Sequence, residues 1–115
     1  MIDLRKLMLM IQEQKQMNAN LSLEFDCDLD HEDPKPLIKV INYIINYLVP
    51  LSDNAIEISL NAYREGYMLS FALFTDLAEL PPLSDQLDEA LQTYNGSLEL
   101  KQEQGKFIQI IITFE

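Results

Sequence analysis

The stretch from Lys35 to Val49 constrains the fold more than any other part of this chain. Its polar side chains fall on one narrow stripe at helical spacing, and nearly every other residue is aliphatic or tyrosine. A helix of this kind must be covered on most of its circumference. It begins after Asp33 and Pro34, which suit a helix start, and stops at Pro50. The polar stripe consists of Lys35, Lys39, Asn42 and Asn46.

Apolar residues at helical spacing predict two further helices. One runs from residue 3 to about residue 17, with Asp3 placed favourably at its amino end. The other begins at Ser84, which can cap its first turn, and is ended by Gly96. The inward-facing residues are Leu4, Leu7, Met8 and Ile11 in the first helix and Leu87, Ala90, Leu91 and Tyr94 in the last.

Alternation of apolar and polar residues predicts five strands, the first over residues 21–29 and the others in two hairpins. The hairpins join residues 56–61 to 67–74 and 97–102 to 106–114, with turns at Gly66 and Gly105. The last strand is apolar on both faces, so we place it centrally. The order predicts an α+β fold in one domain over residues 1–115: a two-layer α/β sandwich with a mixed five-stranded sheet and three helices on one face.

The acidic composition restricts the classes of partner that this chain can bind. The net charge of −11 argues against binding nucleic acid or an anionic membrane surface, because both are polyanions. No segment reaches the ~18 apolar residues that span a bilayer, and the start does not have the pattern of a signal peptide. Cys27 is the single cysteine, which excludes an internal disulfide and fits a reducing compartment. We expect a cytoplasmic protein.

Four stretches of the sequence, taken in order, resemble a known family. They are "IDLRKLMLMIQEQKQMNANLSLEFD", "DPKPLIKVINYIINYLVPLS", "NAIEISLNAYREGYMLSFALF" and "LDEALQTYNGSLELKQEQGKFIQIIITF". Together they resemble the ATP-binding domain of sensor histidine kinases, the Bergerat or GHKL fold shared with gyrase. The resemblance covers essentially the whole chain.

The family's second helix carries two asparagines that hold magnesium and phosphates. Laying the family pattern on this sequence without a gap puts Tyr43 and Tyr47 at those two positions. Asn42 and Asn46 then lie one residue early, about 100° around the helix. Shifting the match by one residue would restore Asn46, at the cost of placing Lys39 on a buried aliphatic position.

The family's glycine boxes are also missing. Asp76 stands where the family's adenine-reading aspartate would be, but Ala78 and Leu80 replace the glycines that follow. A backbone that cradles phosphates needs glycine for close approach and positive φ. The ATP lid is absent as well, so the resemblance implies a degenerate, non-catalytic pseudo-ATPase with no cofactor and no metal. Asn46, Tyr47 and Asp76 are its vestigial pocket positions.

The side of the helix that would have faced the nucleotide must be filled by side chains or offered to a partner. Tyr43, Ile44, Tyr47 and Leu48 are the residues concerned. Filling of the core is one interpretation, and an exposed patch that binds a protein is the other. The acidic run from Glu24 to Asp33 has the same two interpretations, a solvated loop or a contact for a basic partner.

Two other motifs fail on inspection. The run that begins at His31 resembles the phosphoacceptor box of the same kinases, but Pro34 places this histidine in a loop. Asp26, Asp28 and Asp30 have the opening spacing of an EF-hand, but the required glycine and glutamate are absent. We therefore expect neither a phosphoacceptor nor a calcium site.

The leading hypothesis is a non-catalytic scaffold or docking domain of a bacterial two-component or phosphorelay system. Its partner would be a response regulator or a histidine-bearing helical hairpin, as the resemblance implies. The alternative is a regulatory domain that senses ATP or ADP weakly through Asn46 and Asp76.

Overall fold

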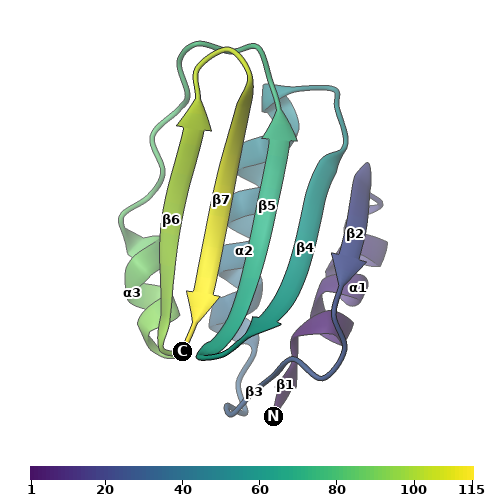
Figure 1. Cartoon of the computed structure of the whole chain (residues 1–115), viewed down its shortest axis with the longest axis vertical. Coiled ribbons are helices and arrows are strands. Elements are labelled where there is room, and N and C mark those ends of the chain that lie inside the picture. Colours follow the sequence, from purple (N-terminus) through teal and green to yellow (C-terminus); the bar gives the residue numbers. More distant parts are fainter.

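In the computed structural model of residues 1–115, three helices cover one face of a five-stranded sheet (Figure 1). The strand order is β2-β4-β5-β7-β6, with β2 and β4 parallel and all other neighbours antiparallel. This confirms the predicted fold class. The elements are β1 (Ile2–Asp3), α1 (Leu4–Lys15), β2 (Ala19–Leu23), β3 (Asp28–Leu29), α2 (Lys35–Leu48), η1 (Val49–Leu51), β4 (Ile56–Tyr63), β5 (Gly66–Phe74), α3 (Gln86–Gln92), β6 (Gly96–Glu103) and β7 (Phe107–Phe114).

The helix α2 lies behind the middle strands of the sheet, between α1 and α3 (Figure 1). Its buried residues recur on the side that faces the strands, as the sequence predicts. They pack against alternate residues of β4, β5 and β7, which supply the other half of the core. The buried residues of α2 are Leu37, Val40, Ile41, Ile44, Ile45 and Leu48.

Side-chain hydrogen bonds fix the helix starts near the predicted positions. The Asp3 carboxylate accepts a bond of 3.0 Å from the Lys6 amide at the start of α1. The Asp33 carboxylate accepts one of 3.0 Å from the Lys35 amide before α2. At its other end α2 does not stop sharply at Pro50, because the 3-10 turn η1 continues it. No helix is both long enough and apolar enough to cross a membrane.

The predicted first strand over residues 21–29 is wrong as a single element. Only β2 pairs with the sheet, and the last bond to it runs from the Glu24 amide to the Leu60 carbonyl. Asp26 then has a left-handed backbone, with φ of 61°, which turns the chain back, and β3 pairs with β1 instead. Phe25 is 69% exposed, whereas Cys27 is buried. The alternation therefore identified some core residues but not a continuous strand.

Two details at the carboxyl end also differ from the prediction. Helix α3 ends at Gln92, and Gly96 begins β6 instead of capping the helix. The left-handed residue is Asn95, with φ of 54°. A Cβ on Gly96 would lie 3.1 Å from the Leu91 carbonyl oxygen, so close approach explains this glycine. The strand β7 is interior, as predicted, although β5 occupies the centre of the sheet.

Candidate functional site

The tyrosines of α2 face the chain segment that joins β5 to α3. We call residues 76–84 the closing segment and the side of α2 that bears Tyr43 and Tyr47 the tyrosine face. The Tyr47 hydroxyl donates a hydrogen bond of 2.6 Å to the Pro81 carbonyl oxygen. The Tyr43 hydroxyl accepts one of 3.1 Å from the Ser84 amide. Both tyrosines therefore bind the protein's own chain.

The closing segment is held at further points along its length. Just before it, the Thr75 hydroxyl donates a buried bond of 2.8 Å to the Leu51 carbonyl oxygen. The Gln104 amide donates a bond of 3.2 Å to the Ala78 carbonyl oxygen. Within the segment, Leu80 and Leu83 pack against the core. The segment thus covers the carboxyl-terminal part of the tyrosine face.

Burial raises the pKa of the Tyr47 hydroxyl above its ordinary range, and the neighbouring Tyr43 raises it further. The hydroxyl is therefore neutral near pH 7 and keeps its proton for the bond to Pro81. A neutral phenol is a poor magnesium ligand. This electrostatic setting favours a structural role for Tyr47.

The candidate interaction patch is only partly at the surface. Ile44 and Leu48 are fully buried against the sheet, as the core-filling interpretation expects, so they offer no area to a partner. Tyr47 is half-buried, and Tyr43 is 36% exposed. Tyr43 lines an open groove of about 540 Å³ between α2 and α3, together with Lys39. The accessible part of the patch is therefore the Tyr43 groove.

The structure does not bring the two remaining vestigial positions together. The Asn46 side-chain oxygen accepts a bond of 3.0 Å from the Lys15 ammonium group of α1, and one residue of helix turns it about 100° away from Tyr47. Asp76 is exposed in a separate depression of about 500 Å³, beside Lys106. Lys39 is exposed while Val40 and Ile41 are buried, which agrees with the register that puts tyrosines at the family's asparagine positions.

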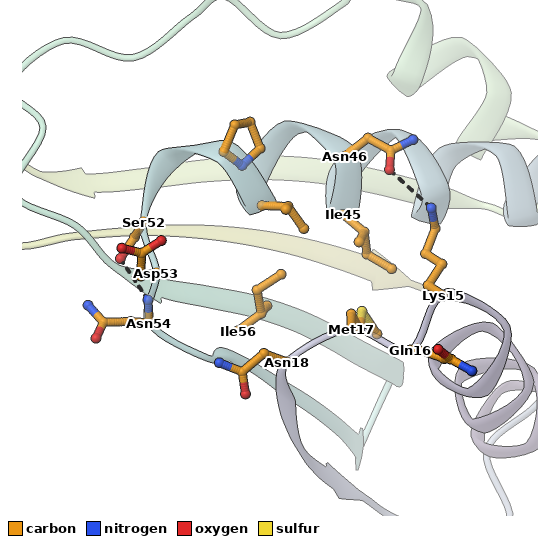
Figure 2. Close-up of a pocket in the computed structure, with 12 residues that line it drawn as sticks. Lys15, Gln16, Met17, Asn18, Ile45, Asn46, Ser52, Asp53, Asn54 and Ile56 are labelled. Atoms are coloured by element: carbon orange, nitrogen blue, oxygen red, sulfur yellow. Dashed lines mark hydrogen bonds between the residues drawn. The ribbon is translucent and has the colours of Figure 1, made fainter.

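The largest cleft of the molecule lies at Asn46, and sequence reasoning missed it (Figure 2). We call it the asparagine cleft. It has a volume of about 670 Å³, and its walls are the turn after α1 (residues 15–18), the end of α2 and the loop before β4 (residues 52–54). These walls are far apart in the sequence, and apart from Asn46 none carries a motif. Only the fold brings them together.

The acidic loop holds no arrangement suited to a metal. No three side chains of His, Cys, Asp or Glu are grouped as metal ligands would be. His31 lies in the loop, where its Nδ1 atom accepts a bond of 3.1 Å from the Asp33 amide. Its ring meets the edge of Tyr94, with 4.8 Å between the ring centres. The histidine is thus part of the packing beside the start of α2.

Several solved structures of histidine kinases are similar to this chain. No family model and no curated protein sequence matches the chain. It is similar to the histidine kinase AdeS of Acinetobacter baumannii, with a TM-score of 0.72 and 13% identity over 99% of this chain and 65% of that chain. It is also similar to the histidine kinase domain of the E. coli osmosensor EnvZ, with a TM-score of 0.76 and 9% identity over 98% of this chain and 86% of that one.

A third similar structure is the cytoplasmic segment of the histidine kinase QseC, with a TM-score of 0.72 and 15% identity. The match covers 99% of this chain and 76% of that chain. The chain thus spans about two thirds to three quarters of AdeS and QseC. At these identities the likeness establishes a histidine-kinase ATPase-like fold, and nothing finer.

Proposed function

We propose that this chain is a non-catalytic scaffold or docking domain of a bacterial two-component or phosphorelay system, acting in the cytoplasm. Its partner is a response regulator or a histidine-bearing helical hairpin. Two findings support the proposal: the likeness to histidine kinases in fold, and the closed tyrosine face of α2.

The hydrogen bond between Tyr47 and Pro81 carries the proposal. By resemblance, Tyr43 and Tyr47 stand where the family binds magnesium and phosphates. Here the closing segment occupies the space next to them, and the short bond of 2.6 Å fixes it there. A nucleotide would have to displace this segment before it could reach Tyr47.

The remaining polar groups are no better suited to a nucleotide. The Asn46 oxygen, the atom that could coordinate magnesium, is already hydrogen-bonded to the Lys15 ammonium. The net charge of −11 opposes a polyphosphate. Gly66 cannot serve a phosphate loop, because a Cβ there would lie only 1.8 Å from the Phe114 carbonyl oxygen, so the glycine is needed for strand pairing.

Nucleotide titration tests whether the chain has lost the ability to bind a nucleotide. We would add AMPPNP, with and without magnesium, and follow backbone amide signals by NMR, using the kinase ShkA, whose structure was solved with AMPPNP, as the positive control. We expect no saturable shifts. Magnesium-dependent saturation that is lost in Asp76→Ala, and kept in the remote control Asp30→Ala, would overturn the proposal in favour of nucleotide sensing.

Partner binding tests the docking role. Calorimetry would measure binding of the chain to two kinds of partner from the same cell. These are the receiver domains of response regulators and the histidine-bearing helical hairpins. We expect one of them to bind and Tyr43→Glu to weaken that binding by about tenfold, because partly exposed aromatic residues often anchor interfaces. Met68→Glu, at an equally exposed apolar residue on the strand β5, is the control. Equal weakening by both variants, or no binding to any of them, contradicts the proposal.

A further inference from the structure

The asparagine cleft has an apolar floor between two charges of opposite sign (Figure 2). Lys15 lies at one end, where its ammonium group contacts the Asn46 oxygen. Asp53 lies in the loop at the other end, is exposed and forms no ion pair. Met17, Ile45 and Ile56 are drawn between them. A complementary ligand would therefore carry both signs of charge, with an apolar group in the middle.

The edge of the cleft adds groups that suit a peptide backbone. Gln16 and Asn18 are exposed, line the cleft and carry side-chain amides, each of which both donates and accepts hydrogen bonds. Val49, also on the lining, is 52% exposed and offers apolar area to an incoming side chain. The volume of about 670 Å³ falls in the range of sites that enclose ligands.

We propose that the asparagine cleft docks an extended segment of a partner protein in which an apolar side chain stands between an acidic and a basic residue. The acidic residue pairs with Lys15 and the basic residue with Asp53. This inference rests on the proposed docking function and gives it a second surface, distinct from the Tyr43 groove.

Electrostatics disfavours an anionic ligand in the same place. The carboxyl ends of α1 and α2 both meet the cleft, and helix carboxyl ends carry partial negative charge. Lys15 is the single cation on the lining, and Asp53 offsets it. A segment with no net charge avoids repulsion by a chain of net charge −11 and still satisfies both ends.

Blocked synthetic peptides test the inference. The probe is acetylated and amidated Glu-Val-Leu-Val-Lys, titrated at physiological salt while backbone amide signals are followed by NMR. We expect saturable shifts confined to residues 15–18 and 52–54. The controls are Lys-Val-Leu-Val-Lys, Glu-Val-Leu-Val-Glu and Glu-Ser-Ser-Ser-Lys, each expected to bind at least about tenfold more weakly.

Charge reversal sharpens the test. Asp53→Lys should weaken the mixed-charge probe by about tenfold and strengthen binding of Glu-Val-Leu-Val-Glu, because the cleft then has cations at both ends. Asp85→Lys makes the same change of charge away from the cleft and should alter neither. Both aspartates are exposed, so both variants are expected to fold, which their amide spectra would verify.

Four results would overturn the inference: no binding of the mixed-charge peptide, shifts outside the cleft, equal binding of the serine peptide, or equal weakening by Asp85→Lys. The outcome is separable from that of the nucleotide experiment. Magnesium-dependent binding of AMPPNP would defeat the proposed function without changing the peptide shifts. Absence of peptide binding would defeat this inference and leave the nucleotide result as it stands.

Discussion

The tyrosine face and the asparagine cleft lie on two sides of the same helix, and they have opposite surroundings. The Tyr47 hydroxyl donates a hydrogen bond to the Pro81 carbonyl oxygen, and the closing segment thereby covers the carboxyl-terminal part of the tyrosine face. Asn46, one residue earlier and about 100° around the helix, binds only the half-buried Lys15 and borders the asparagine cleft. A rotation of one residue thus separates a closed surface from an open one.

The difference between the two sides indicates where a docking surface can lie on α2. The side on which the resemblance would place a nucleotide is partly covered by the closing segment. The open side has no counterpart in the motifs by which the resemblance was recognised. If the chain docks a partner through a concave surface, the asparagine cleft is the larger one available.

The largest expected effect tests the packing of α2 against the sheet. Leu48 is fully buried and the next residue, Val49, is 52% exposed. Leu48→Ala should lower the free energy of unfolding by roughly 2–5 kcal/mol, because it leaves a cavity. Val49→Ala should change it by less than about 0.5 kcal/mol. Urea unfolding measures both changes in free energy. Similar values for the two variants would contradict the packing of Leu48 against the sheet.

The next effect concerns the attachment of the helix start. The buried Tyr94 hydroxyl donates a bond of 2.7 Å to the Asp33 carbonyl oxygen and accepts one of 3.2 Å from the Leu37 amide. Tyr94→Phe leaves both backbone groups without a partner and should destabilise the fold by roughly 1–3 kcal/mol. Tyr67→Phe, whose hydroxyl forms no hydrogen bond within the protein, is the matched control and should be nearly neutral.

The same hydroxyl predicts a dependence on alkaline pH. Burial raises the pKa of Tyr94, with a smaller contribution from Asp33, while the bond from Leu37 opposes the rise. Because the folded-state pKa lies above the ordinary value near 10, the neutral phenol favours the fold below that pH, and this contribution is lost as the pH rises through the folded pKa. The free energy of unfolding, measured from pH 8 upward, should therefore fall less steeply in Tyr94→Phe than in the unmodified protein. An unchanged profile would contradict the assignment.

A smaller effect is expected at the closing segment. Tyr47→Phe removes one hydrogen bond near the surface and should cost roughly 0.5–1.5 kcal/mol. Amide hydrogen exchange within residues 76–84 should become faster, while exchange in β7 stays unchanged. Tyr43→Phe should affect mainly the Ser84 amide. If neither variant alters exchange in the segment, the tyrosines do not hold it closed.

The smallest effect is expected on the open side. Asn46→Ala removes the exposed contact with Lys15 and should change stability by less than about 0.5 kcal/mol, because surface contacts of this kind contribute little. Thermal unfolding would measure it, with Asn42→Ala as the control on the same helix. A loss above about 1 kcal/mol would mean that this contact, and not the apolar packing, fixes α1.

Much of the fold followed from patterns within single segments. The apolar circumference of residues 35–49 predicted a helix enclosed by other elements, and α2 is one. The same pattern placed Ile44 and Leu48 on the former nucleotide side, but they face the sheet, because α2 lies directly against its middle strands. Alternation across residues 21–29 could not reveal the turn at Asp26, because its positive φ leaves the apolar spacing intact.

The site was harder to predict, because its contacts join distant segments. The register predicted that Tyr47 would replace an asparagine, but not that the Pro81 carbonyl would accept its hydrogen bond, since that depends on the path of the closing segment. Lys15 and Asp53 belong to separate segments with no motif between them. Clefts of this kind become visible only when packing brings their walls together.

The parallel pairing of β2 with β4 has a consequence for the order of folding. The two hairpins close short loops, but Asn20 meets Glu57 across 37 residues of sequence. Distant pairings form late, so we expect α1 and β2 to join the sheet last and to detach first. Residues 15–18 connect these two late-forming elements. A ligand bound in the asparagine cleft would therefore stabilise their attachment to the sheet and slow amide hydrogen exchange throughout α1.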